Sequence, residues 1–274
     1  MNITINLVGG LCNQMFQISA AYCLSILYNK RLVIKEIIQS PHSKNNYFET
    51  IFRKINHSNQ MIIDTNYMYI LLFIEPTDGP LLHFDIPNHN NIELIGFFQN
   101  ENYFINYRNN ILSLFEPEPE REIKLKNTYI DIYNSYFIHI RRGDYLYDEL
   151  HYINLDEYYV KAIEYILLIN SNAIFYVFSD DITYCHTIKY LDQPCIKFIK
   201  DLDEINSLYL MSMCYQGGIG SNSSYSWWGG YMNENKNKIV IYPNKWFNSD
   251  WEVDIGWKGC YIMNINDYTI NKKL

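Results

Sequence analysis

The feature that most restricts the fold is an alternation of short apolar runs and helical segments in the second half of the chain. The predicted strands are residues 136–140, 174–178, 195–199, 217–220 and 238–242, and the predicted helices are 154–168, 203–215 and a segment after Ser221. This alternation implies a parallel sheet with crossover helices. Because ligands of such sheets bind beyond the carboxyl ends of the strands, a site is expected at 139–144, 179–181 and 221–226.

The beginning of the chain predicts a similar unit. An apolar strand at 3–8 ends in Gly9-Gly10, apolar positions at helical spacing follow over 13–28, and residues 32–34 predict the next strand. Asn13 is expected to cap the helix. The pattern is weaker between 40 and 110, where short strands or helix pieces are expected at Ile62, Ile63, 67–74 and 93–97.

Two domains are expected, since 274 residues are enough for two of ordinary size. Residues 116–122 combine proline with like charges, which disfavours both a helix and a buried strand. The boundary is therefore predicted there, with domains at 1–120 and 121–274.

Composition excludes several classes of protein. A net charge of -8 argues against a nucleic-acid-binding surface, which needs clustered Lys and Arg. The six cysteines show no C-x-x-C pair and no metal-ligand spacing with histidine, so free, mostly buried thiols are expected. Because no signal peptide and no run of about 18 apolar residues is visible, we expect no transmembrane segment and a cytoplasmic location, free or peripheral to a membrane.

Two adjacent guanidinium groups follow an apolar strand in the segment His139-Ile140-Arg141-Arg142-Gly143-Asp144-Tyr145. A guanidinium fork suits bidentate contact with a diphosphate and stays charged at any working pH. A solvated surface pair is the alternative, but the preceding strand and the following glycine favour a phosphate site. The embedded Arg-Gly-Asp tripeptide is better explained by chance than by cell adhesion.

Three further segments carry groups suited to a nucleotide. Gly9-Gly10 allows close backbone approach at a helix N-terminus, although an ordinary tight turn explains it equally well. Ser179-Asp180-Asp181 supplies carboxylates for a base, a ribose or a helix cap, and the pair lacks the D-x-D spacing of metal-dependent sugar transfer. In 217–231, Trp227-Trp228 are assigned to the core, whereas the hydroxyls at 221–224 need partners that a nucleotide would supply.

These four segments, in this order, resemble the hallmark stretches of the α1,2-fucosyltransferases, glycosyltransferase family 11. The matching residues are 9–17, 139–145, 178–181 and 221–229, so the resemblance spans most of the chain. Two positions depart from the family pattern: Cys12 stands where the family usually has glycine, and Tyr225 stands where it has phenylalanine.

The resemblance implies an α/β, GT-B-like fold in which two Rossmann-like domains face a central cleft. Domain 1–120 would lie on the acceptor side and domain 121–274 would bind GDP-fucose. The donor-binding residues that it implies are Gly10, Asn13, His139, Arg141, Arg142, Asp180, Asp181, Ser221, Asn222, Ser223 and Ser224. No metal or other cofactor is expected, and Arg141 and Arg142 would take over the part of a metal in catalysis.

The implied reaction is inverting transfer of fucose from GDP-β-L-fucose to the 2-hydroxyl of a terminal β-galactose on an oligosaccharide or glycolipid. Such transfer forms an α1,2 linkage in cell-surface glycan biosynthesis. The alternatives are an α1,6 or α1,3 fucosyltransferase, and an inactive GDP-sugar- or glycan-binding protein. A Rossmann oxidoreductase is disfavoured because no G-x-G-x-x-G fingerprint is present.

Transfer also requires a group that removes the proton of the acceptor hydroxyl. The candidates are Asp144, Asp148 and Glu149, which follow the arginines. Glu149 is the predicted base because it lies ten residues after His139, a spacing similar to that of the proposed base in the related α1,6-fucosyltransferases. Asp144 is expected to hold the turn or an arginine within the same catalytic group.

Overall fold

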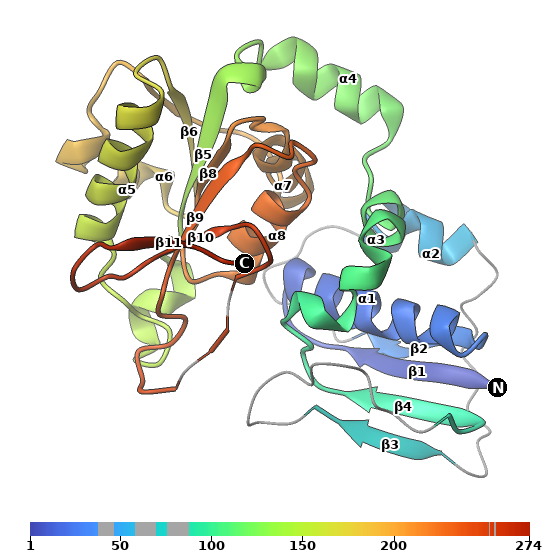
Figure 1. Ribbon diagram of the computed structural model, residues 1–274. Coiled ribbons are helices and arrows are strands. Elements are labelled where there is room, and N and C mark those ends of the chain that lie inside the picture. Colours follow the sequence, from blue (N-terminus) through green and yellow to red (C-terminus); the bar gives the residue numbers. More distant parts are fainter. Residues whose placement is uncertain (38–46, 58–69, 76–87, 252, 255) are drawn as a thin grey trace. The chain divides into compact units, whose positions relative to one another are not determined.

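The computed structural model describes residues 1–37, 47–57, 70–75, 88–251, 253–254 and 256–274. The chain divides into two compact units, Met1–Pro117 and Glu118–Leu274 (Figure 1). This division lies inside the segment 116–122. The elements expected at Ile62, Ile63 and 67–69 lie outside the described residues.

The first unit contains a parallel sheet of four strands in the order β2-β1-β4-β3. The strands are β1 (Asn2–Leu7), β2 (Arg31–Ile37), β3 (Leu71–Ile74) and β4 (Asn91–Ile95), and the helices are α1 (Leu11–Leu27), α2 (Arg53–His57) and α3 (Arg108–Leu114). Helix α1 contacts β1 and β2 and buries most of its length. Because β1 and β4 are parallel neighbours, their carboxyl ends lie side by side.

The second unit is built on a sheet of seven strands in the order β11-β10-β9-β8-β5-β6-β7. The strands are β5 (Ser135–Ile140), β6 (Ile174–Ser179), β7 (Ile196–Phe198), β8 (Gly217–Ile219), β9 (Ile239–Pro243), β10 (Tyr261–Met263) and β11 (Ile270–Lys272). The helices are α4 (Pro119–Thr128), α5 (Asp156–Ile169), α6 (Ile182–Cys185), α7 (Glu204–Met213) and α8 (Ser224–Tyr231). All neighbouring strands are parallel except β10 and β11. The five strands predicted in this unit are confirmed, and β10 and β11 extend the sheet.

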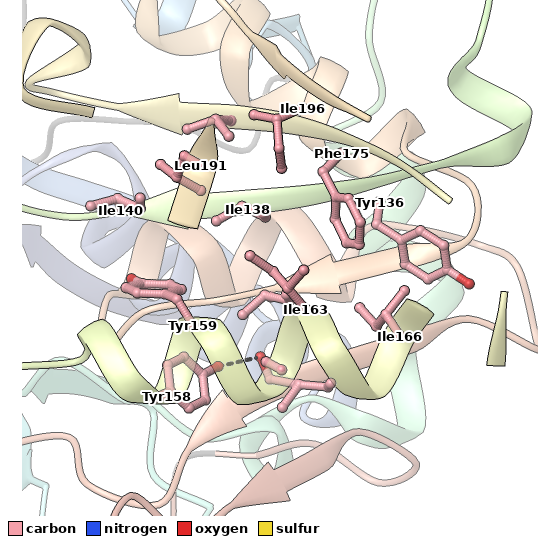
Figure 2. Close-up of a cluster of buried hydrophobic side chains, with 14 of the residues drawn as sticks. Tyr136, Ile138, Ile140, Tyr158, Tyr159, Ile163, Ile166, Phe175, Leu191 and Ile196 are labelled. Carbon is pink, nitrogen blue, oxygen red and sulfur yellow. Dashed lines mark hydrogen bonds between the residues drawn. The ribbon is translucent and has the colours of Figure 1, made fainter. Parts of the chain in front are cut away.

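Helices cover both faces of this sheet, with α5 and α6 on one side and α7 and α8 on the other (Figure 1). Figure 2 shows Tyr159, Ile163 and Ile166, at helical spacing on α5, turned toward β5. The hydroxyl of Tyr158 donates to the backbone oxygens of Gly220 and Ile241, at 2.8 and 2.9 Å, and so ties α5 to the sheet. This core holds the carboxyl ends of the central strands in place.

Two local predictions are wrong. Asn13 does not cap α1, because the left-handed turn at Gly9 (φ +83°) lets the helix begin at Leu11 with Gly10 as the N-cap residue. The segment 116–122 does not exclude a helix, since α4 begins at Pro119. Proline lacks an N–H that the first helical position would leave unpaired, and Glu120 and Glu122 favour the positive end of the helix.

Candidate active site

The strand order of the second unit places a switch point between β5 and β8. The chain runs from β5 outward through β6 and β7, then returns to β8 on the opposite side of β5. Ligands of open parallel sheets bind at such a point, beyond the carboxyl ends. His139 near the end of β5 meets Ser221 beyond β8, with Nδ1 and Oγ 3.1 Å apart, although the two residues are 82 positions apart in the chain.

Asp180, beyond β6, organises the arginine turn. Its Oδ2 accepts a hydrogen bond from Nη1 of Arg141, and its Oδ1 accepts one from the backbone N–H of Arg142 at 2.9 Å. Gly143 has a φ of +30°, and a Cβ there would lie 2.4 Å from Oδ2 of Asp180. Arg141 also donates through Nη2 to Asp144, so the predicted holding role of Asp144 is observed and Arg141 is held by two carboxylates.

Arg142 is held differently. Its Cζ lies 3.2 Å from the ring centroid of Tyr184, and its Nε donates to Oδ2 of Asp181 at 3.3 Å. The Oδ1 atom of Asp181 accepts from the backbone N–H of Tyr184 and caps α6. Among the described residues no hydrogen bond engages the two Nη atoms of Arg142, whose side chain is 21% exposed. This is the guanidinium with the most unused donor capacity at the switch point.

The predicted hydroxyl and amide cluster is buried and has protein partners. Nδ2 of Asn222 donates to the backbone oxygens of His151 and Trp246, both at 2.9 Å. Oγ of Ser223 accepts from the N–H of Tyr225 and caps α8. Ser224 is half-buried at the first position of α8. The hydroxyls of Ser221 and Ser223 therefore do not need a nucleotide to supply their hydrogen-bond partners. Contact between these residues and a nucleotide stays a prediction.

His139 is neutral in this setting. Burial, together with the charge of Arg141, lowers its pKa to about 3. The hydroxyl of Tyr159 donates to the backbone oxygen of His139 at 2.8 Å. The imidazole of His139 lies against the ring of Tyr225, which occupies the position where phenylalanine was expected. His139 is thus a buried, uncharged group that joins the end of β5 to Ser221.

A cavity lies beside the arginines, entirely within the second unit. It is lined by Ile140, Arg141, Arg142, Tyr145, Leu146, His151, Tyr152, Ile153, Asn154, Leu155, Asp156, Tyr159, Tyr184, Ile188 and Asn222. His151 and Tyr184 are among the lining residues that sequence reasoning did not single out. Each lies three residues after an aspartate that accepts a hydrogen bond from its backbone N–H, namely Asp148 and Asp181. The same spacing joins Asp203 to Asn206, which does not line the cavity, so no local signal pointed to His151 and Tyr184.

The comparison with known families decides the class of this protein. The sequence model of glycosyl transferase family 11 matches residues 1–260. The chain belongs to glycosyltransferase family 11. An alpha-1,2-colitosyltransferase of Escherichia coli is 30% identical over 275 residues, which cover 90% of this chain and 93% of the relative. The O-antigen biosynthesis glycosyltransferase WbnK of Escherichia coli is 28% identical, covering 88% and 93%.

The fold is also found among solved structures. POFUT1 in complex with GDP-fucose aligns with a TM-score of 0.51 at 11% identity, over 88% of this chain and 97% of that one. Such a likeness at low identity shows the fold alone. The predicted α/β, GT-B-like fold class of this family 11 glycosyltransferase is confirmed.

Two other candidate residues of the family 11 motifs do not line the cavity. Gly10 and Asn13 belong to the first unit, where Oδ1 of Asn13 accepts from Nε2 of Gln99 at 2.8 Å. In the same motif, Gln17 accepts from the N–H of Val8 and donates to the backbone oxygen of Gly96, which joins the ends of β1 and β4. That motif therefore has a structural role in its own unit.

The remaining sequence predictions are simple to place. Glu149 is exposed, and its backbone oxygen accepts from Nδ2 of Asn248. Trp227 and Trp228 are buried in the core, as predicted. All six cysteines are free and five are buried. Within the described ranges, no helix is both long and apolar enough to span a bilayer, and no group of three or more His, Cys, Asp or Glu residues suits a metal ion.

Proposed function

We propose that this glycosyltransferase moves fucose from GDP-β-L-fucose to the 2-hydroxyl of a terminal β-galactose, with inversion and without a metal. The observation that carries the proposal is the pair Arg141-Arg142 at the switch point, where Arg142 keeps both Nη atoms for a ligand. The α1,2 linkage is supported by the E. coli relative whose name gives that linkage.

The chemistry asks for stabilisation of a leaving diphosphate. The acceptor oxygen attacks C1 of the sugar while the bond from C1 to the phosphate oxygen breaks, and the electron pair stays on GDP. Fixed cations stabilise that charge most effectively where they need no reorganisation. Arg142, stacked on Tyr184, is the proposed pyrophosphate ligand, and Arg141, fixed by Asp180 and Asp144, supplies a second positive charge.

The carboxylates of the site support a metal-independent reaction. Asp180 accepts from Arg141 and from the N–H of Arg142, and Asp181 caps α6 and pairs with Arg142. Both side chains are therefore engaged in holding the arginine turn, and a metal would have to compete with these bonds. Asp180 and Asp181 stay proposed contacts of the guanine or ribose, with Ser221, Asn222, Ser223 and Ser224 lining the same pocket.

The first test is release of GDP from GDP-fucose in EDTA, with lactose and N-acetyllactosamine as acceptors. Arg142→Ala is expected to lower kcat by about 100-fold or more, because a transition-state charge contact is lost. Arg142→Lys keeps the charge but lacks the guanidinium fork, and its kcat is expected to lie between those of the wild type and Arg142→Ala. Lys161→Ala, which removes an exposed ion pair on α5, is the control and should match the wild type.

Each outcome of this assay is informative. Turnover that requires an added divalent cation would contradict metal independence, and full activity of Arg142→Ala would contradict the role of that arginine. Linkage analysis of the product distinguishes α1,2 from α1,3 or α1,6 transfer. A wild-type protein that binds GDP-fucose and turns over no acceptor would support the binding-protein alternative.

A second donor is favoured by one observation. The relative at 30% identity is named a colitosyltransferase, and colitose is fucose without its 3-hydroxyl. GDP-colitose therefore belongs in the same assay. A kcat/KM that is higher for GDP-colitose than for GDP-fucose would assign colitose as the transferred sugar and leave the proposed role of Arg142 unchanged.

A further inference from the structure

A short turn beyond the arginines builds an aspartate-histidine pair. Oδ1 of Asp148 accepts from the backbone N–H groups of Leu150 and His151, at 2.9 and 3.3 Å. Oδ2 of Asp148 lies 2.6 Å from Nδ1 of His151. The turn thus fixes the carboxylate with its own backbone, and the carboxylate fixes the imidazole. The hydrogen bond from His151 lowers the pKa of Asp148, so this carboxylate stays charged at neutral pH.

Two aromatic rings contact the imidazole, and a buried amide holds the backbone of the same residue. Its ring centroid lies 4.9 Å from that of Tyr145 and 5.3 Å from that of Phe247. The backbone oxygen of His151 accepts from Nδ2 of Asn222, which is buried. These contacts join the turn to the loops after β8 and β9. An imidazole that is hydrogen-bonded to a carboxylate and packed against two rings loses little conformational freedom when a substrate binds.

His151 lines the same cavity as Arg141 and Arg142. With Nδ1 donating to a carboxylate, the neutral ring carries its proton on Nδ1 and has a lone pair on Nε2. Among the described residues no hydrogen bond engages Nε2. The cavity therefore combines two cations suited to a leaving diphosphate with one oriented imidazole.

We propose that His151 is the catalytic base of the reaction, with Asp148 as its positioning residue. This inference rests on the proposed sugar transfer. As the acceptor oxygen forms its bond to C1 of the donor sugar, the hydroxyl proton passes to Nε2 of His151, and the bond from C1 to the diphosphate breaks toward GDP. The resulting imidazolium is paired with Asp148, in the way that an aspartate supports the histidine of a hydrolytic triad.

The other titratable groups facing the cavity are poorer bases. They are Arg141, Arg142, Tyr145, Tyr152, Asp156, Tyr159 and Tyr184. Burial raises the pKa of Tyr145 to about 12 and raises that of Tyr159 as well, so both keep their protons. Asp156 accepts from the hydroxyl of Tyr190. Glu149 is exposed on the same turn as His151 and is the competing candidate.

The test compares pH profiles of kcat and the acceptor KM for the wild type, His151→Gln, Asp148→Asn and Glu149→Gln. His151→Gln is expected to lower kcat by about 100-fold or more, to leave GDP affinity unchanged and to lose the acidic limb of the profile. Asp148→Asn should lower kcat by about tenfold or more, because an amide can donate to Nδ1 and stabilise the wrong tautomer. His151→Ala should regain turnover when imidazole is added. His186→Gln, at the C-cap of α6 beside Phe198, is the control variant.

An acidic limb that persists in His151→Gln and disappears in Glu149→Gln would overturn the assignment. A readout that does not depend on the donor separates this inference from the proposed function. In ¹⁵N-histidine NMR of the full chain, the neutral His151 ring is expected to carry its proton on Nδ1, and Asp148→Asn should shift that equilibrium. A proton on Nε2 in the wild type would overturn the inference, whereas absence of turnover with every donor would overturn the proposed function.

Discussion

At the scale of single residues, the two adjacent arginines have different environments although the sequence makes them look equivalent. Arg141 donates to Asp180 and Asp144, whereas Arg142 stacks on Tyr184. The pairing of Arg141 depends on Gly143, since any side chain there would collide with Asp180. The sequence predicted a phosphate site at this pair, which stays a prediction, and it carried no information on which guanidinium keeps donors for a ligand.

His139 allows a prediction about stability. Its pKa is about 3 in the folded protein, against an ordinary value of 6.5. Between these values the unfolded chain binds a proton that the folded chain does not, so this residue destabilises the fold as pH falls from about 6.5 toward 3. At pH 5 the effect is about 2 kcal/mol relative to neutral pH. His139→Gln should therefore lose about 2 kcal/mol less than the wild type between pH 7.5 and pH 5.

Urea unfolding at the two pH values measures this difference. The comparison between pH values cancels any constant cost of the substitution itself. His186→Gln is the control, because its ring lies outside the buried site. An unchanged pH dependence in His139→Gln would show that His139 takes up its proton without opposing the fold.

At the scale of elements, the helices and strands with strong periodicity were predictable and the short or polar ones were not. Helix α5 repeats apolar residues at helical spacing, and β5 and β6 consist mainly of apolar residues. Strands β10 and β11 are only three residues long, and β11 contains Asn271 and Lys272. These two strands form because each pairs with a neighbouring strand, and the local sequence pattern does not show which strands are neighbours.

Strand β8 depends on glycine for its place between β5 and β9. Gly217 has a φ of +117°, and a Cβ there would lie 2.0 Å from the backbone oxygen of Ile239. Gly217→Ala should therefore displace β9 from β8. Gly259 is a matched control, since its φ is +98° and a Cβ there would meet no atom within 4 Å.

Both alanine variants place a side chain at a positive φ, and only the Cβ at position 217 collides with the backbone of Ile239. Gly217→Ala is expected to lower the free energy of unfolding by about 1–3 kcal/mol more than Gly259→Ala does. Chemical denaturation of the two variants measures the difference. Equal losses would mean that β8 and β9 separate at no cost, which contradicts the close approach of their backbones.

At the scale of the whole molecule, all residues that line the cavity belong to the second unit. A fragment of residues 118–274 has its own sheet and its own core. If it folds alone, as circular dichroism would show, it is expected to bind GDP within about tenfold of the full chain, a difference of about 1.4 kcal/mol. It should lack acceptor-dependent turnover, because the first unit is the proposed acceptor side.

Titration calorimetry of the fragment and of the full chain measures this. A folded fragment with much weaker affinity would assign part of the donor site to the first unit, where Gly10 and Asn13 were predicted to contribute. Gly10→Ala in the full chain would then separate the two units' contributions, since a Cβ at Gly10 meets no atom of the chain within 4 Å.

The sequence by itself determined the class of fold, the family and the segments that are proposed to carry the chemistry. These properties are local: apolar periodicity specifies strands and helices, and polar residues directly after a strand lie at its carboxyl end. Only the tertiary structure decided which strands are neighbours, and so brought His139 to Ser221 across 82 residues. It also brought His151, paired with Asp148, into the lining of the cavity that Arg141 and Arg142 share. Strand order follows from the packing of helices on both sheet faces, a long-range effect that no short pattern contains.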